Sequence, residues 1–418
     1  MKNIALLLIL SALPLLVNAA GFALSEQSGS GLGNAFAGAS ASAEDASTIF
    51  FNPAGMTYIE GTQLVGVINA INPNVDFNNQ GSVAGAGNPL GGNGGNAGSL
   101  TFIPNFYFKT DLPHDIKFGL GVNTPFGLTT EYNSDWVGRY QAIKSSVKTV
   151  NINPALAFKA SDKLSLGAGF SAIWTQAELT NAVNLGSFGE AGAKVKGDDW
   201  GFGFNLGAIY QLTPDSRLGL AYRSKVEQHL TGDVSFTRPA GALPAPILAA
   251  TANGAIAADL TLPETLSLSG FSQINDKLDL LADVTWTRWS QFKDLTINHS
   301  SGTLLSTVPE NWNNTMRYSV GANYHYSDAI KLRGGLAYDK EAISDQFRTA
   351  RIPGNDRKWL ALGAGFKLTP KDNLDVGYAH LFVSEADINS NLGAAKGALI
   401  GAFDSNVDII SMQITHQF

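Results

Sequence analysis

The 418-residue sequence contains no cysteine, which excludes disulfides, thiol catalysis, iron–sulfur clusters and cysteine-ligated zinc. Charged residues make up only 15% of the chain, against roughly 25% in an ordinary soluble domain. The net charge of −7 argues against nucleic acid as a partner, since that ligand requires a basic surface. Beyond the first twenty residues there is no run of about 18 apolar residues, so no transmembrane helix is predicted. A membrane-spanning form of this chain must therefore be a β-barrel.

Motifs for catalysis and cofactor binding are missing as well. The six histidines form no HExxH or i, i+4 ligand pair, and no GxSxG elbow accompanies a histidine. The glycine-rich stretch 29–33 lacks the GK[ST] ending of a phosphate-binding loop. We therefore predict no enzyme activity, no metal and no cofactor. A catalytic site assembled from residues far apart in the sequence stays open, because such a site needs no local motif.

The chain begins with the pattern of a secretory signal peptide. Lys2 supplies the positive charge, Ile4 to Val17 the apolar stretch, and Val17-Asn18-Ala19 the small residues before a cleavage site. The apolar stretch is short for a membrane anchor and is followed by glycine and serine rather than by charge. We predict a signal peptide over residues 1–19, with cleavage one residue later as the alternative.

Residues 20–60 are rich in glycine, alanine and serine and contain few bulky apolar side chains before Ile49. Such a segment forms neither a strong helix nor a long strand, and it buries little apolar area. It ends in Asn52-Pro53-Ala54, where Pro53 fixes its own φ and biases Asn52 towards an extended backbone. We predict a small plug over residues 20–60 that becomes ordered only inside an enclosure.

From residue 61 to residue 418 the dominant period is two. In Gly201–Tyr210, as in many other segments, apolar side chains alternate with glycine and asparagine. An exposed sandwich face would carry many charges, whereas a small or polar second face fits a barrel lumen packed against a plug, with lipid outside. Short turns such as Thr213-Pro214-Asp215 alternate with longer loops. The predicted fold class is all-β: an antiparallel transmembrane barrel of about fourteen strands with the N-terminal plug in its lumen.

Two further features indicate the outer membrane of a Gram-negative bacterium. The last strand alternates and ends in Phe418, which resembles the signal that barrels present to their assembly machinery; an edge strand ending in phenylalanine by chance is the alternative. Aromatic residues near the predicted strand ends are interpreted as girdles at the lipid interface. They are Trp174, Trp200, Tyr210, Trp286, Trp289, Trp359 and Tyr378.

Together these features resemble the FadL family of outer-membrane long-chain fatty acid transporters, which also includes aromatic hydrocarbon channels. The segments that carry the likeness are Ala20–Leu24, Ser30–Gly33, Ala46–Met56, Pro125–Tyr132, Trp200–Asn205, Tyr222–Ser224 and Trp289–Phe292. The resemblance implies a monomeric passive channel with a hatch in its lumen and a bent third strand. A hydrophobic substrate would leave sideways into the bilayer, which avoids exposing apolar area to water at ~0.8 kcal/mol per CH₂.

The resemblance places part of the substrate pocket at the extreme N-terminus, on Gly21, Phe22 and Leu24. For Phe22 the alternative is ordinary packing of an anchored terminus. Asn52, Pro53 and Ala54 are interpreted as a hatch element against the bent strand, with a simple turn as the alternative.

The third strand should contain the break in the wall. Gly121 permits a bend there, and Pro125 cannot donate to the hydrogen-bond ladder, so both are assigned to the gate. Phe126, beside Pro125, is assigned to substrate binding.

The outer loops depart from the family pattern. In well-known members of the family, the loop after the fifth strand is long and helps to form an outer capture groove. The corresponding segment here, 181–197, is short. Segment 238–258 is apolar, and we expect a short amphipathic capture helix with Leu243, Ile247 and Leu248 as substrate contacts. Arg139, Arg317 and Arg333 are head-group candidates by charge only.

Three transport or binding functions fit this architecture: a fatty acid channel, an aromatic or alkane hydrocarbon channel, and a structural barrel that serves as adhesin or phage receptor. A carboxylate needs a cationic partner in the lumen, and Lys331, Arg333 and Lys367 have lumenal parity, which favours the acid. The plug argues against a purely structural barrel, because such a barrel needs no removable obstruction.

Overall fold

The computed structural model describes residues 21–418, so the predicted signal peptide lies outside the described residues. Eight wall strands are continuous: β1 (Gln63–Asn79), β2 (Thr101–Asp111), β5 (Lys144–Lys159), β6 (Leu164–Asn184), β7 (Glu190–Thr213), β16 (Ile330–Asp339), β17 (Arg357–Lys367) and β20 (Ala398–Gln417).

Six wall strands are each interrupted once. They are β3 (Lys117–Asn123) with β4 (Gly127–Glu131), β8 (Ser216–Arg223) with β9 (Val226–Thr237), β10 (Gly254–Leu262) with β11 (Thr265–Asn275), β12 (Leu278–Thr287) with β13 (Asp294–His299), β14 (Leu304–Pro309) with β15 (Thr315–Ser327), and β18 (Asp372–Val383) with β19 (Ala386–Asn391).

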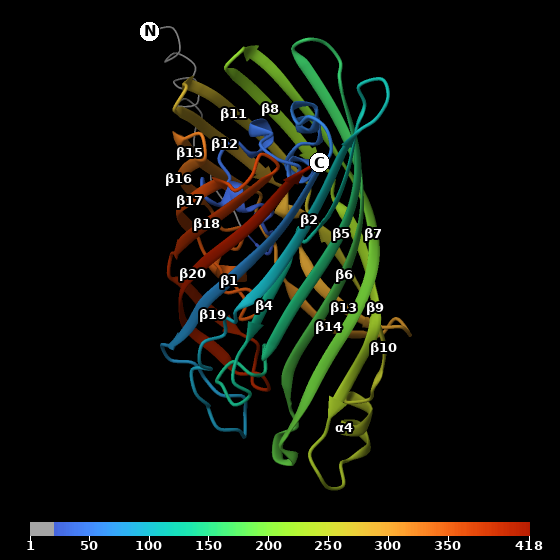
Figure 1. Ribbon diagram of the computed structural model, residues 1–418. Coiled ribbons are helices and arrows are strands. Elements are labelled where there is room, and N and C mark those ends of the chain that lie inside the picture. The colour runs from blue at the N-terminus through green and yellow to red at the C-terminus, as the bar shows by residue number, and fades with distance from the viewer. Residues whose placement is uncertain (1–20) are drawn as a thin grey trace.

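These elements form a closed antiparallel barrel of fourteen wall strands around the N-terminal hatch (Figure 1). β1 pairs with β20 from Gln63 opposite Gln417 to Asn79 opposite Gly401, so the first and last strands close the wall. Closure removes the free sheet edges that an open sheet of this size would expose. The predicted fold class is confirmed.

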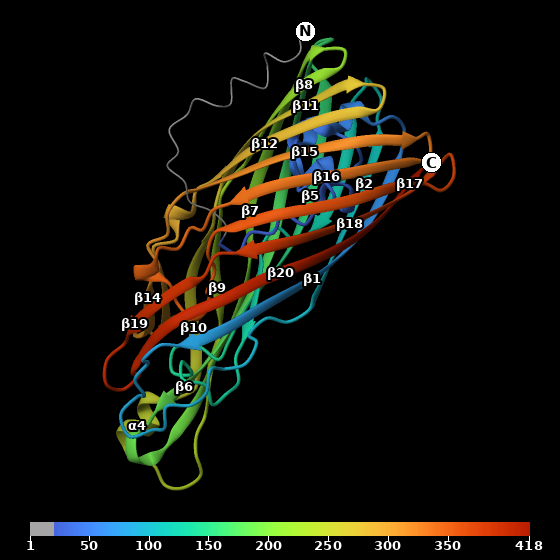
Figure 2. The same ribbon diagram turned by 90° about the vertical axis from the view of Figure 1, so that its left-hand side faces the viewer.

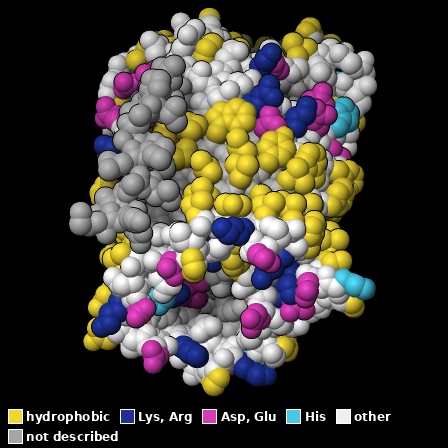
Figure 3. Space-filling model, turned by 90° about the horizontal axis from the view of Figure 1, so that it is seen from above, with side chains coloured by type: hydrophobic (Ala, Val, Ile, Leu, Met, Phe, Trp, Pro, Cys, Tyr) yellow, Lys and Arg dark blue, Asp and Glu magenta, His cyan; other side chains and the backbone are white. Residues whose placement is uncertain are grey.

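Apolar side chains lie on the outside of the wall, as the period of two predicts. In β7, Phe202 and Phe204 are 62% and 46% exposed, whereas Asn205 is buried. The space-filling view shows apolar side chains gathered in a band, with charged side chains on both sides of it (Figure 3). In a membrane this band faces lipid.

The two ends of the barrel differ. Short turns and the C-terminus lie at one end, whereas the longer connections and α4 (Ala245–Ala250) lie at the other (Figure 1, Figure 2). The hatch lies towards the short-turn end. Outer-membrane barrels have short periplasmic turns and longer outer loops, so the hatch occupies the periplasmic half of the lumen. Within residues 21–418, no helix has both the length and the apolar character needed to cross a membrane.

The hatch consists of very short helices, and side chains of the wall strands donate hydrogen bonds to their free carbonyl groups. They are α1 (Gly29–Leu32), α2 (Ala39–Ser42), α3 (Thr48–Phe51) and the 3₁₀ helix η2 (Pro53–Tyr58). Short helices leave carbonyls unpaired, and wall arginines donate to several of them. The bonds are Arg217 to Ala41 (2.6 Å), Arg223 to Phe50 (2.8 Å) and Arg317 to Ala35 (2.9 Å).

An ion network of buried and partly exposed side chains also holds the hatch. Lys331 Nζ lies 2.7 Å from Glu44 Oε1, and Arg333 binds both Glu44 and Asp375, at 2.5 and 2.8 Å. Burial alone would raise the pKa of Glu44, but the charges of Arg333 and Lys331 hold that pKa well below its usual range. Lys331 and Arg333, which the sequence favoured for a substrate carboxylate, are therefore paired with hatch and wall carboxylates. Lys367 is exposed.

The triplet Asn52-Pro53-Ala54 packs against β6 and β7, and η2, which begins at Pro53, also contacts β3, the first part of the bent strand. The role of the triplet as a hatch element stays a prediction. Asn52 Nδ2 donates to the carbonyls of Ser40 (2.7 Å) and Ala208 (3.1 Å). A Cβ built on Gly207 would lie 1.9 Å from Asn52 Oδ1. The asparagine amide can reach the β7 backbone because glycine leaves room for it.

We expect Gly207→Ala to loosen the hatch, because the new methyl group overlaps Asn52 and overpacking costs about 1–3 kcal/mol. Cells carrying the variant should become more sensitive to a large polar antibiotic such as vancomycin. The control is Gly334→Ala on the outside of β16, where the nearest atom to the new Cβ is 3.9 Å away. Equal sensitivity of the two variants would contradict the close-approach account.

Candidate functional site

The third wall strand is interrupted between β3 and β4. β3 pairs with β2 only as far as Val122 opposite Phe106, and β4 pairs with β5 alone. Residues 101–105 of β2 therefore have no strand partner on this side, and we call the space between them and β4 the wall gap. Pro125 lies in the interruption, as predicted.

Gly121 does not form the bend. It lies inside β3, opposite Tyr107 on β2 and Asn153 on β5, and the strand continues to Asn123. The pairing of β3 ends at Val122 on one side and Asn123 on the other, and Pro125, which supplies no N–H, lies in the interruption that follows, so the proline rather than the glycine marks the break.

The N-terminal segment pairs with the interrupted strand. Ala23 and Phe126 form an antiparallel bridge. Leu24 N donates to Pro125 O at 2.9 Å, and Gly127 N donates to Phe22 O at 3.0 Å. Residues 22–24 thus supply hydrogen bonds that the break removes from the wall.

Phe22 lies at the centre of an aromatic cluster on the lumenal side of the break. Its ring centroid is 4.8 Å from Trp289, 5.8 Å from Trp312, 5.9 Å from Phe126 and 6.2 Å from Phe292, each in an edge-on arrangement. Such pairs contribute about 0.5–1.5 kcal/mol each beyond area burial. The cluster therefore fixes the N-terminal segment against the break.

Gly21 is held from both sides. Its N–H donates to Glu341 Oε1 at 3.3 Å, and its carbonyl accepts from Arg357 Nη2 at 3.3 Å. The residue has φ +48°, and a Cβ built there would lie 2.6 Å from the Trp312 ring. Only glycine fits this position, for both reasons.

A cavity of about 510 Å³ lies at the wall gap. Its lining includes side chains from both faces of the wall: Phe102 and Val150 point outwards, whereas Trp359 and Ile409 are buried in the lumen. Residues 21–26 of the N-terminal segment form one side. The volume falls within the range of small-molecule sites, about 300–1,000 Å³.

A second cavity of about 160 Å³ lies deeper in the lumen and is lined by Phe126, Arg223 and Arg317. Ala23 and Leu24 line both cavities. The N-terminal segment therefore stands between the lumen and the wall gap.

The structure brings Gly21, Phe22, Leu24 and Phe126 together, but it places the predicted capture residues elsewhere. Ile247 and Leu248 lie on α4 and Leu243 just before it, at the long-loop end, and Leu248 is 42% exposed. None of the three lines either cavity.

The sequence missed most of the aromatic partners of Phe22. Trp289 and Trp359 were interpreted as interfacial girdles, which is wrong: both are buried in the lumen, at 1% and 3% exposure. Trp289 lies in the short 3₁₀ helix η4 (Trp289–Gln291), where the interruption after β12 turns the chain off the strand path. The loss of period-two alternation after Thr287 is the sequence feature that could have indicated this.

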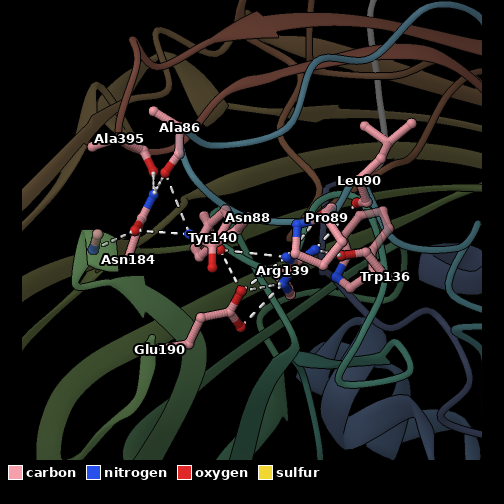
Figure 4. Close-up of polar contacts among 11 residues, drawn as sticks. Ala86, Asn88, Pro89, Leu90, Trp136, Arg139, Tyr140, Asn184, Glu190 and Ala395 are labelled. Atoms are coloured by element: carbon pink, nitrogen blue, oxygen red, sulfur yellow. Dashed lines mark hydrogen bonds and ion pairs between the residues drawn. The ribbon is translucent and has the colours of Figure 1, made fainter. Parts of the chain in front are cut away.

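At the long-loop end, polar contacts tie several connections together (Figure 4). The Arg139 guanidinium donates to Glu190 (2.9 Å) and to the carbonyls of Pro89 (2.8 Å) and Leu90 (3.1 Å). Arg139 lies in the connection between β4 and β5, so these contacts join that connection to the one after β1 and to the start of β7. Arg139, a head-group candidate by charge, is therefore paired with Glu190 and lines neither of the two cavities.

The same network reaches the connection before β20. Asn184, at the end of β6, donates to the carbonyls of Ala86 and Ala395, each at 3.0 Å (Figure 4). The loop after β6 has only five residues, 185–189, because the long strands β6 and β7 themselves extend towards the long-loop end of the barrel. Across residues 21–418, no cluster of three or more His, Asp or Glu side chains is suited to hold a metal ion.

A closed barrel with a lipid-facing apolar wall, an internal hatch and a cavity at a wall gap defines a transport barrel of the outer membrane. The model of the family described as "Outer membrane protein transport protein (OMPP1/FadL/TodX)" matches residues 10–418, and the chain belongs to this family. Members of the family are transport proteins, and the relatives are outer-membrane proteins of Gram-negative bacteria.

Individual relatives agree with this assignment. Outer membrane protein P1 of Haemophilus influenzae is 33% identical over 404 residues, covering 87% of this chain and 86% of that protein. A long-chain fatty acid transport protein of Escherichia coli O6:H1 is 29% identical over 408 residues, covering 90% of each.

Solved structures are similar throughout. A Pseudomonas aeruginosa FadL homologue superposes with a TM-score of 0.89 at 28% identity, covering 96% of this chain and all of that one. The Ralstonia pickettii toluene transporter TbuX superposes with a TM-score of 0.66 at 20% identity, covering 93% and 99%, which shows a shared fold.

Proposed function

We propose that this protein is a passive channel that takes up long-chain fatty acids, binds them beside the N-terminal segment and releases them sideways through the wall gap. The observation that carries the proposal is the position of residues 22–24 between a lumenal cavity and a cavity open to both faces of the wall. A chain that follows this path keeps its apolar area out of water throughout.

The N-terminal segment acts as the gate in this account. Residues 22–24 are held against the break by two backbone hydrogen bonds, the Phe22 ring and the Leu24 side chain beside Gly127, and none of these contacts belongs to the ladder of the other strands. An apolar substrate replaces the contacts that Phe22 loses. Uptake then needs no energy source beyond the concentration gradient.

Arg357 favours an acid over a neutral hydrocarbon. It lines the cavity at the wall gap, and among the described residues its guanidinium forms no ion pair; its hydrogen bond is to the Gly21 carbonyl. Glu26 lines the same cavity, and burial raises the pKa of its carboxyl. A substrate carboxylate near Arg357 gains a charge-assisted hydrogen bond.

Uptake of oleate beside toluene tests the proposal, in cells that lack their own transporter and carry this chain. We expect oleate uptake to be restored. Arg357→Gln should then lower oleate uptake about tenfold, because a hydrogen bond to a charged group contributes about 1.5–3 kcal/mol, and should leave toluene uptake unchanged. Lys358→Gln, at the adjacent exposed position, is the control.

The fold likeness to toluene transporters supports a second candidate, a channel for neutral aromatic hydrocarbons. Restoration of toluene uptake without oleate uptake would favour that candidate. Failure to restore either substrate by a folded, membrane-inserted protein would remove the transport proposal and favour a structural barrel.

A further inference from the structure

The outside of the barrel carries an apolar groove of about 480 Å³ beside the wall gap. Its floor is Gly66 on β1, where a built Cβ would meet only Ile414 Cγ2, at 3.7 Å. Gly66 alternates with the buried, inward-facing Val65 and Val67, so it faces outwards. A glycine here leaves a dent in a wall that is otherwise covered by larger side chains.

Strand register shows how the groove is built. Leu374 lies opposite Ile414, Ile414 opposite Gly66, Gly66 opposite Phe106, and Phe106 opposite Val122. These five positions form one row across five neighbouring strands, with the glycine in the middle. Phe106 and Ile414 therefore flank the dent as its two walls, with 41% and 45% of their surfaces exposed.

The groove is continuous with the wall gap. In the next outward-facing row, Met412 lies opposite Ile68, and Ile68 lies opposite Pro104. Pro104 lines both the groove and the cavity at the gap. It also lies in the part of β2 that has no partner on the β3 side, so no strand separates the two spaces.

The groove leads from the gap towards the periplasmic end. Ile414 is four residues from the C-terminal Phe418, or about 13 Å along the strand, and the C-terminus lies at the short-turn end. No charged side chain lines the groove within the described chain, and its one polar residue, Asn105, is buried and donates to the Glu26 carbonyl. The surface suits a single alkyl chain.

We propose that this groove receives the alkyl tail of the substrate as it leaves the wall gap and guides it along the barrel into the periplasmic leaflet. The inference rests on the proposed lateral exit. The groove adds a second apolar contact for a chain that has left the cavity with its tail first. It therefore increases the rate of release and leaves affinity for the lumenal site unchanged.

The test fills the dent. Gly66→Leu should lower oleate uptake at least fivefold, while oleate binding to the purified protein, followed by tryptophan fluorescence, stays at the wild-type value. The matched control is Gly334→Leu, an outward glycine on β16 whose nearest neighbour to a built Cβ is 3.9 Å away. Normal heat-modifiable migration on gels checks that both variants fold.

A second variant fills the groove only after the barrel has folded, so a folding defect cannot explain a loss of uptake. Gly66→Cys introduces the only cysteine of the chain, and hexyl methanethiosulfonate then fills the groove after assembly. We expect uptake to fall on modification and to recover with reductant.

Uptake by Gly66→Leu that equals the Gly334→Leu control, together with unchanged uptake when Gly66→Cys is modified, would overturn the groove proposal, including the case in which bilayer lipid simply occupies the dent. Failure of the proposed function looks different: the wild-type protein would then neither bind nor take up oleate.

Discussion

Joining the N-terminal segment to the strand break by a disulfide should stop oleate uptake, with a decrease of more than tenfold. Ala23 and Phe126 lie opposite each other, and the flanking bonds from Leu24 N to Pro125 O and from Gly127 N to Phe22 O make them a non-hydrogen-bonded pair. Such pairs have Cα atoms about 4.5 Å apart, within the range that a disulfide spans. The double variant Ala23→Cys, Phe126→Cys therefore locks the segment in place.

The absence of native cysteine makes this experiment clean, because only one disulfide can form. Reduction should return uptake to the level of the Phe126→Cys single variant, which controls for the lost aromatic ring. Full uptake by the oxidised double variant would show that substrate passes without movement of the N-terminal segment, and the gate account would be wrong.

Removal of residues 20–24 from the mature chain should lower oleate uptake about tenfold while the barrel stays folded. The deletion takes Phe22 out of the aromatic cluster, and burying one such side chain stabilises by about 1.5–3 kcal/mol. It also removes one side of the cavity at the wall gap. The shortened protein should bind oleate weakly, and small solutes should leak through the opened path.

Phe22→Ala in the intact segment distinguishes the contribution of the Phe22 side chain from that of the backbone, which the deletion removes together. We expect it to weaken binding, because the ring contacts are lost, yet to cause less leakage than the deletion. Unchanged uptake in the deletion variant, with normal migration on gels, would rule out a role of the segment in the substrate pocket.

The fold was predictable because alternation is a local property. Each strand of a barrel displays its two faces in its own sequence, so segments such as Gly201–Tyr210 indicate the wall without knowledge of their partners. Pro125 was predictable for the same reason, since a missing N–H interrupts a ladder wherever the strand lies. The N-terminal residues of the site came instead from the family resemblance.

The rest of the site depends on contacts between distant parts of the chain. Trp289 lies 267 positions from Phe22, and the loss of alternation after Thr287 indicates only that the strand is interrupted there, not which side chains the tryptophan contacts. The lumenal charges were equally ambiguous: Arg333 pairs with Glu44 and Asp375, whereas Arg357 forms no ion pair among the described residues and donates to the Gly21 carbonyl. Strand parity gives the face of a residue, but only the packed hatch decides which cations are already paired.

Photo-crosslinking with a fatty acid that carries a diazirine near the end of its tail tests the central claim most directly. The purified protein is irradiated at low ligand concentration, and labelled peptides are identified by mass spectrometry. We expect labels on the N-terminal segment around Phe22 and on the rim of the wall gap, from Phe102 to Pro104 and at Leu128. Labels confined to the long-loop end around α4, or to the hatch helices α3 and η2, would contradict a path through the wall.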